Sequence, residues 1–213
     1  PKAVEKGARS NLDRHIRNML QFGMPVVVSI NRFHTDTQAE LDALKLAALD
    51  SGAKDVVVFD GHSRGGIGGL ELAKAVVAAT QEHLAAGRPF TPLFTKDTTI
   101  AEKALKIATQ IYGGAGINIT AKAHRQLKQL EDWGYGNIPV CMAKTQYSFS
   151  HDPDLLGAPT DFEIPIREFR LNAGAGFVVA VLGEMMTMPG LPKRPAAADM
   201  DMDEDGNLTG LFS

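Results

Sequence analysis

The sequence has little cysteine, few aromatic residues and no long apolar segment. Its single cysteine, Cys141, excludes an internal disulfide, and the apolar segment IPVCMAK around it predicts a small buried side chain. No apolar run approaches the roughly 18 residues of a membrane-spanning helix, and no signal-peptide pattern is present, so we expect a cytoplasmic protein. The net charge of −3 gives no general attraction to nucleic acid or to an anionic membrane.

The sequence also lacks the usual motifs that bind the phosphate groups of a nucleotide. The dipeptide Gly-Lys never occurs, which excludes a Walker loop within these residues. The segment RGGIGGLELA spaces Gly66 and Gly68 as in a dinucleotide-binding loop, but Glu71 stands at the third glycine position. Three interpretations of this segment remain: a hinge, a close backbone contact, or a helix start that holds an anion.

Metal-binding patterns are weak as well. The six histidines include no H-x-x-x-H pair, so with one cysteine a structural zinc site is not expected. The acidic segment DMDMDEDG places Asp201, Asp203 and Asp205 at calcium-loop positions, but Phe212 occupies the position of the last carboxylate ligand. We therefore predict a solvated acidic turn in this segment.

The remaining composition is that of a globular protein, with 44% hydrophobic and 22% charged residues among 213. Near the start, Ser10 and Asp13 form a capping-box pattern, and apolar residues then repeat at helical spacing. We interpret residues 1–23 as a connecting helix from an amino-terminal domain that lies outside this sequence.

Residues 24–97 have the pattern of an α/β subdomain. Residues 26–30 and 56–59 are short, continuously apolar and rich in valine, which is typical of strands buried on both faces of a parallel sheet. Thr37 and Glu40 predict a capping box at the start of the helix between them. With a second helix over 69–86, the order is strand–helix–strand–helix, which predicts a parallel sheet flanked by helices.

Three further features complete the organisation of the chain. The segment FTPLF at 90–94 is a candidate third strand, and DGHSRGGIGG at 60–69 is expected to be a long flexible turn. Residues 98–213 form a smaller α+β subdomain with long Gly- and Pro-rich loops, with helices expected over 98–111 and 120–132. Its strands are expected after residue 137.

Polar and aromatic residues gather where the first strand ends. Ligands of parallel sheets bind beyond the carboxyl ends of the strands, and both predicted strands end on polar segments. The segment NRFHTD, which begins at Asn31, offers an aromatic face and hydrogen-bonding groups that suit a flat heteroaromatic ring. Alternatively, Phe33 closes the top of the core, and Thr35 and Asp36 only cap the following helix.

Two other segments are weaker candidates. Lys144 follows an apolar strand in MAKTQYSFS, where it either holds an anionic group or reaches from the sheet edge to solvent. The proline-rich segment MTMPGLPKRPAA at 186–197 carries Lys193 and Arg194 and is a candidate substrate wall or interface.

Several segments, in this order, closely resemble the carboxyl-terminal part of formate–tetrahydrofolate ligase, also called 10-formyltetrahydrofolate synthetase. The resemblance covers essentially all 213 residues, and its longer runs are specific. The segments are INRFHTDTQAEL, GGIGGLELA, IATQIYGGAGINITAKA, GYGNIPVCMAKTQYSFS, REFRLNAGAGF, MTMPGLPKRPAA and DEDGNLTGLF.

The resemblance implies a reaction, its cofactors and its partners. Enzymes of this family convert ATP, formate and tetrahydrofolate into 10-formyltetrahydrofolate, ADP and phosphate through formyl phosphate. ATP with magnesium, tetrahydrofolate, and activation by a monovalent cation are thus implied, as is a homotetramer. The family's Walker-loop domain is amino-terminal, so the catalytic residues are expected outside this chain.

The resemblance also assigns binding residues. In the family, an N-x-F-P-T-D segment and a tryptophan after the next strand enclose a flat ring, adenine or pterin, by stacking. Asn31, Phe33 and Asp36 match that segment; His34 replaces its proline, and His62 stands where the tryptophan is expected. Asp36 is assigned chiefly as a helix cap. The resemblance also implies that Val58 lines the same pocket.

Two function hypotheses follow from these assignments. In the first, the chain supplies a ring-binding wall and subunit contacts to a ligase and is inactive alone. In the second, it is a non-catalytic nucleotide-binding or structural module derived from that ligase. A companion segment with the pattern G-x-x-x-x-G-K-[ST] discriminates between them.

Overall fold

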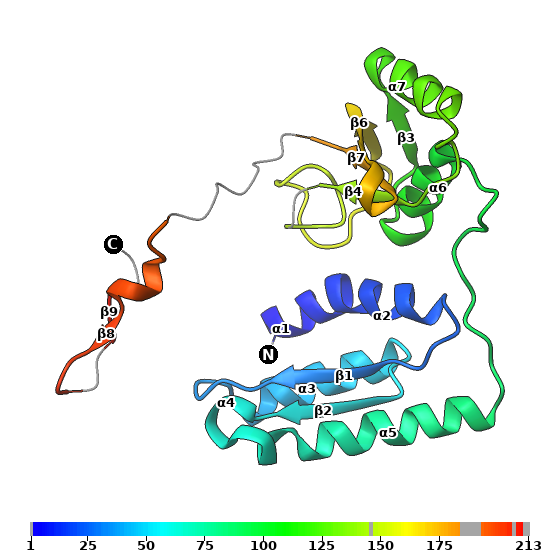
Figure 1. The fold of residues 1–213 in the computed structure, drawn as a ribbon. Coiled ribbons are helices and arrows are strands. Elements are labelled where there is room, and N and C mark those ends of the chain that lie inside the picture. The colour runs from blue at the N-terminus through cyan, green and yellow to red at the C-terminus, as the bar shows by residue number, and fades with distance from the viewer. Residues whose placement is uncertain (1, 145–146, 184–192, 206–207, 211–213) are drawn as a thin grey trace.

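A computed structural model describes residues 2–144, 147–183, 193–205 and 208–210. Its helices and strands form two groups, one on each side of the extended segment 88–97, and each group has its own hydrophobic core (Figure 1). The sheets contain parallel strand pairs with helices against them, which confirms the predicted α/β fold.

The first group is built on two parallel strands, β1 (Val27–Asn31) and β2 (Asp55–Phe59). Helix α3 (Gln38–Asp50) connects them, and Thr37 begins it with the predicted capping box to Glu40. One face of the sheet packs on α3 and the amino-terminal helix. The buried side chains of this core are Ile16, Ile30, Leu41, Ala48, Ala53 and Val56.

The amino-terminal helix is longer than its capping pattern predicts. It runs through α1 (Lys2–Gly7), a π-helical turn η1 (Ala8–Leu12) and α2 (Asp13–Leu20). The prediction that Ser10 caps this helix is wrong, because Ser10 lies inside the helix and its hydroxyl donates to the carbonyl oxygens of Lys6 and Gly7. A serine hydroxyl bonded to the preceding turn is compatible with a helix interior, so the pattern alone did not fix the start.

Residues 60–69 form short helices where a flexible turn was expected: α4 (Gly61–Arg64) and the 3-10 helix η2 (Gly65–Gly69). Helix α5 (Leu70–Ala85) follows and contacts both strands. The Phe59 ring lies so close to Gly61 and Gly69 that a Cβ atom at either glycine would contact it. Val56 and Phe59 are three positions apart on β2, so their side chains lie on opposite faces of the sheet. Val56 packs in the core with α3, and Phe59 lies against Gly69 at the start of α5. Helix α5 therefore covers the face of the sheet opposite to α3.

The predicted third strand at 90–94 is wrong: these residues form no strand, and Thr91 only donates its N–H to the carbonyl of Phe22. FTPLF has strand-like composition, but its proline removes a ladder donor. The second group then follows with these elements: α6 (Ile100–Lys106), η3 (Ile107–Ile111), β3 (Gly116–Ile119), α7 (Ala121–Asp132), β4 (Val140–Ala143), β5 (Glu163–Ile166), β6 (Glu168–Asn172), η4 (Ala173–Ala175) and β7 (Phe177–Val181).

The second group has a mixed arrangement of strands. β3 pairs in parallel with β5, and β7 lies between parallel β4 and antiparallel β6. The predicted helices at 98–111 and 120–132 are present and begin at Thr99 and Thr120. Strand β3 is not predicted from the sequence, because its four residues follow a glycine-rich segment that reads only as a separator between helices.

The prediction that Cys141 is buried is also wrong, since its side chain is exposed. Cys141 lies on β4, one of the two outer strands of the order β4-β7-β6. Its strand neighbours are half-buried against the second core, so the alternation of side chains turns Cys141 to the outer face. An apolar run does not indicate which face of the strand is covered by other elements of the fold.

Helix α2 joins the two groups. The Arg14 Nε and the Asn18 Nδ2 donate to the carbonyl oxygen of Ile111, at 3.1 and 2.8 Å. The rings of His15 and Phe149 pack 4.6 Å apart between centroids, and burial is the larger cause that lowers the pKa of His15, ahead of the nearby Lys144 charge. The segment assigned to residues 1–23 therefore contacts both groups of elements.

The carboxyl-terminal residues add a 3-10 turn η5 (Ala196–Asp199) and a two-stranded antiparallel pair, β8 (Asp201–Met202) and β9 (Leu208–Thr209). Asp203 accepts a hydrogen bond from the N–H of Asp205, as expected for an acidic turn. Residues 145–146, 184–192 and 211–213 lie outside the described residues, and so do much of the proline-rich segment 186–197 and the Phe212 position.

A pH-dependent prediction arises from this fold at Tyr112. Burial, together with the nearby Cys141, raises the pKa of Tyr112 to about 12, whereas an unfolded tyrosine titrates near 10. Between these values the unfolded chain loses a proton that the folded chain keeps. We therefore expect the free energy of unfolding to fall by up to about 3 kcal/mol as the pH rises from 10 to 12.

Absorbance at 295 nm, which follows tyrosinate formation, tests this prediction in the folded chain. Of the three tyrosines, one is expected to ionise about two pH units above an ordinary phenol. Tyr112→Phe is expected to remove that late step. Late ionisation that persists in Tyr112→Phe contradicts the assignment.

Candidate functional site

The candidate site lies where β1 and β2 end at their carboxyl termini. The β1–α3 turn and helix α4 lie at the same end of the sheet (Figure 1). In the register of the strands, Asn31 is opposite Phe59, and Ile30 is opposite Val58. Pairing continues one residue beyond β1, since the N–H of Arg32 donates to the carbonyl of Phe59 at 3.0 Å.

The turn after β1 is held by Asp36. Its Oδ2 accepts the N–H of Phe33 at 2.7 Å, and its own N–H donates to the carbonyl of Phe33 at 3.1 Å. The assignment of Asp36 as a helix cap is therefore wrong: Thr37 caps α3, and Asp36 closes the turn before it. Because Asp36 fixes the backbone of Phe33, the ring is presented from a defined position.

Apolar side chains are exposed at this edge. The Phe33 side chain is 61% exposed, and Val58 is 36% exposed although it points to the same face of the sheet as the buried Val56. The reading in which Phe33 closes the core is wrong, since a core residue would be buried. A solvent-exposed phenylalanine on a fixed turn is available for contact with a ligand or another protein segment.

The second half of the edge is the segment 60–69. The N–H of Asp60 donates to the carbonyl of Gly68 at 3.3 Å, and a Cβ atom at Gly68 would lie 2.3 Å from the carbonyl oxygen of Asp60. Gly65 has φ 58° and ψ −143°, a conformation open essentially to glycine alone. The glycines therefore shape a tight loop, which carries His62 exposed on α4.

The structure thus brings the sequence-predicted residues to one edge without joining them directly. Neither His34 nor His62 has a ring contact among the described residues, and both side chains are exposed. No hydrogen bond between these residues is present in the described part of the chain. The residues placed at this edge are Asn31, Phe33, His34, Val58 and His62.

Three residues at this edge were not predicted from the sequence. Ile67 is 70% exposed on the glycine-rich loop. Arg32 and Arg64 are exposed cations directly after β1 and within α4, and neither has an ion-pair partner among the described residues. Arginine directly after a buried strand was the signal available in the sequence, because that position lies at the ligand-binding edge of a parallel sheet.

Comparison with known proteins decides the family. The family model of formate–tetrahydrofolate ligase matches residues 1–212. The chain is 49% identical over 212 residues to the formate–tetrahydrofolate ligase of Symbiobacterium thermophilum and to that of Methylobacterium nodulans. The chain belongs to the formate–tetrahydrofolate ligase family.

These matches cover almost all of this chain but only part of each relative. They cover 99% of this ligase-family chain but 37% of the length of either relative. The chain therefore spans somewhat more than a third of the curated ligases that it matches. The resemblance stated from the sequence is confirmed at the level of the family.

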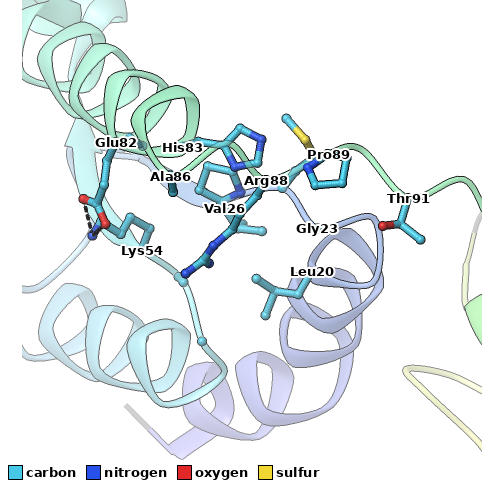
Figure 2. Close-up of a pocket in the computed structure, with 15 residues that line it drawn as sticks. Leu20, Gly23, Val26, Lys54, Glu82, His83, Ala86, Arg88, Pro89 and Thr91 are labelled. Atoms are coloured by element: carbon cyan, nitrogen blue, oxygen red, sulfur yellow. Dashed lines mark hydrogen bonds and ion pairs between the residues drawn. The ribbon is translucent and has the colours of Figure 1, made fainter.

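A separate open cavity of about 630 Å³ lies at the opposite edge of the sheet formed by β1 and β2 (Figure 2). Val26 and Lys54, which precede β1 and β2, line it together with the carboxyl-terminal ends of α2, α3 and α5. None of the sequence-predicted site residues lines it. The cavity therefore does not coincide with the candidate ring-binding edge.

One cation of this cavity, Lys54, has a structural partner. Figure 2 shows Lys54 and Glu82 directed toward one another, with Nζ–Oε distances of 2.7–2.8 Å, and this hydrogen bond is the main cause of the lowered pKa of Glu82. His83 and Arg88 lie near helix carboxyl termini, whose exposed carbonyl groups favour positive charge. We therefore place the candidate site at the other edge.

Two absences apply to the described part of the chain. No group of three or more His, Cys, Asp or Glu side chains there is placed to hold a metal ion. No helix there is both long and apolar enough to cross a membrane.

Proposed function

We propose that this chain is the carboxyl-terminal portion of an ATP-dependent ligase that joins formate to tetrahydrofolate, giving 10-formyltetrahydrofolate, ADP and phosphate. The observation that carries the proposal is the 49% identity to two such ligases over almost the whole chain. The remaining length of those ligases is where the proposal places the Walker loop, because Gly-Lys is absent here.

In this proposal the carboxyl edge of β1 and β2 forms one wall of the pocket for adenine or pterin. The Phe33 ring is exposed and its backbone is held by Asp36, so it supplies a stacking face with little loss of freedom on binding. Val58 adds apolar contact, and Asn31, His34 and His62 supply hydrogen-bonding groups around the ring.

Arg32 and Arg64 extend this wall. Both ring-bearing substrates carry anionic groups, the phosphates of ATP and the carboxylates of the folate tail. An exposed guanidinium on each side of a ring-binding edge suits such groups, because arginine binds phosphate and carboxylate through paired hydrogen bonds. These two residues therefore orient the ligand that stacks on Phe33.

The other partners of the reaction belong to the rest of the enzyme. Magnesium acts with the ATP phosphates, and the described residues do not form a carboxylate cluster for it. The proposal assigns magnesium, a monovalent cation and formate to the Walker-loop portion. It also includes a cytoplasmic homo-oligomer, to which this chain contributes subunit contacts.

Phe33→Ala is expected to weaken binding of the ring ligand by about fivefold to 150-fold, since an aromatic stacking contact contributes about 1–3 kcal/mol. Isothermal titration of the 213-residue chain with ATP, and separately with tetrahydrofolate, measures this effect and identifies the ring. His62→Trp is expected to strengthen the same binding, because indole offers more stacking area than imidazole.

The matched control is Phe90→Ala. Phe90 is also a phenylalanine with an exposed side chain, at 60%, but it stacks on Phe22 near the other edge of the sheet. Phe90→Ala is expected to leave ring binding unchanged. Equal losses in both variants, or an unchanged affinity in Phe33→Ala, contradict the placement of the ring at the carboxyl edge.

A further inference from the structure

The sheet of the first group is too small to be complete. Among the described residues it contains only β1 and β2, and these pair in parallel. Parallel sheets occur in larger assemblies with both faces covered, and an isolated two-stranded sheet is at best marginally stable. At least one of the two outer edges therefore lacks its neighbour.

The outer edge of β1 has free hydrogen-bonding groups. Arg32 donates to the carbonyl of Phe59, so the even-numbered residues of β1 point their backbone groups toward β2. The backbone N–H and C=O groups of Val27, Ser29 and Asn31 then point away from β2. No backbone partner for them is present in the described part of the chain, and Ser29 and Asn31 are exposed.

The outer edge of β2 differs from that of β1. There the outward N–H of Val56 donates to the Oδ1 of the neighbouring Asp55 at 2.7 Å. A carboxylate on the outward N–H of an edge strand blocks the pairing of a further strand, a device that proteins use against unwanted strand addition. β1 is therefore the edge whose outward N–H groups all lack a partner among the described residues.

The handedness of the connections selects the same edge. Helix α3 connects β1 to β2, and α2 leads into β1 on the same face, since Ile16 shares the core of Leu41 and Ala48. Crossover connections between parallel strands are right-handed in nearly all cases. A parallel strand that uses α2 as its crossover to β1 must then lie beside β1 on the side away from β2.

We propose that the outer edge of β1 pairs in parallel with a strand from the part of the ligase that lies outside the matched segment. The inference rests on the proposed function, and on relatives of which this chain covers 37%. The added strand lies between the α2–α3 layer and the α5 layer, so an apolar, β-branched strand is expected. Its backbone bonds to Val27, Ser29 and Asn31.

Proline variants of β1 test this pairing. Ser29→Pro removes an N–H that points outward, so we expect the midpoint of thermal unfolding of the 213-residue chain to change by less than about 3 °C. Val28→Pro removes an N–H that points toward β2 and is expected to destabilise the same chain strongly. Ser29→Ala is the matched control, because it keeps the backbone N–H.

The probe for the missing strand is the part of the Symbiobacterium thermophilum ligase outside the match, co-expressed as a second polypeptide. It is expected to co-purify with the tagged 213-residue chain and with Ser29→Ala, and at least tenfold less with Ser29→Pro. Amide hydrogen exchange of Val27, Ser29 and Asn31 is expected to slow at least tenfold in the complex.

Three results overturn the pairing. The first is equal recovery with Ser29→Pro, or unchanged exchange at the three amides. The second is failure of the chain to co-purify under conditions in which the relative's own matched segment does. The third is slow exchange at these amides in a dimer of the chain alone, which places a second copy at the edge.

Ligase activity of the mixture is measured separately, so strand pairing without turnover contradicts the proposed function only.

Discussion

The 213-residue chain, supplied with ATP, magnesium, formate and tetrahydrofolate, is expected to produce no measurable 10-formyltetrahydrofolate. Phosphoryl transfer depends on groups that position and neutralise the phosphates, and removing a single such group lowers turnover by about 10³ to 10⁵-fold. This chain has no Gly-Lys dipeptide, and its described residues contain no metal-holding cluster. We therefore expect turnover at least about 10⁴-fold below that of the reconstituted ligase.

Two measurements make this prediction decisive. The absorbance change that accompanies acid conversion of the product measures turnover by the chain alone and by its mixture with the outer portion of the Symbiobacterium thermophilum ligase. Turnover is expected in the mixture and to fall when Phe33→Ala replaces the wild-type chain. Turnover by the highly purified chain alone, lost in Phe33→Ala, contradicts the proposal that the phosphate-binding groups lie outside these residues.

Ile164→Ala is expected to destabilise the second group of elements by about 2–5 kcal/mol, which is a large fraction of the stability of an ordinary domain. Ile164 lies on β5, is fully buried, and pairs in register with Ile117 of β3. Its neighbours in the core come from strands and from α6 and α7, so they cannot collapse into the cavity independently. Urea denaturation with circular dichroism measures the loss.

The control for this variant is the same chemical change at an exposed site. Ile67→Ala removes the same atoms from a side chain that is 70% exposed, and is expected to change the free energy of unfolding by at most about 0.5 kcal/mol. Ile164→Val should lie between the two, at about 0.5–1.5 kcal/mol. Similar losses in Ile164→Ala and Ile67→Ala show that β5 is not in a packed core.

Local sequence patterns predicted the strands and helices that have a strong periodic signal. The valine runs of β1 and β2 and the Thr37–Glu40 capping box are present as expected, because each depends on residues that are close in sequence. The same holds for the helix starts at Thr99 and Thr120. The family also followed from the sequence, through long runs that match in order.

The errors arose where distant contacts decide the outcome. Cys141 is exposed because its side chain lies on the face of β4 that the second core does not cover, and the strand's own sequence does not say which face is covered. The segment at 90–94 has the composition of a strand, yet no neighbouring strand pairs with it. The four residues of β3 form a strand only through their pairing with β5, more than forty positions later.

At the candidate site, the sequence by itself determined which residue types stand after β1 and β2, and thus the chemistry available at that edge. Only the tertiary structure decided that Phe33 is exposed and that Asp36 holds the turn before the helix. The reason is physical: composition and periodicity report on neighbours along the chain, whereas exposure depends on which layers cover a residue. For the same reason, the open edge of β1 became visible only when its hydrogen-bond directions were known.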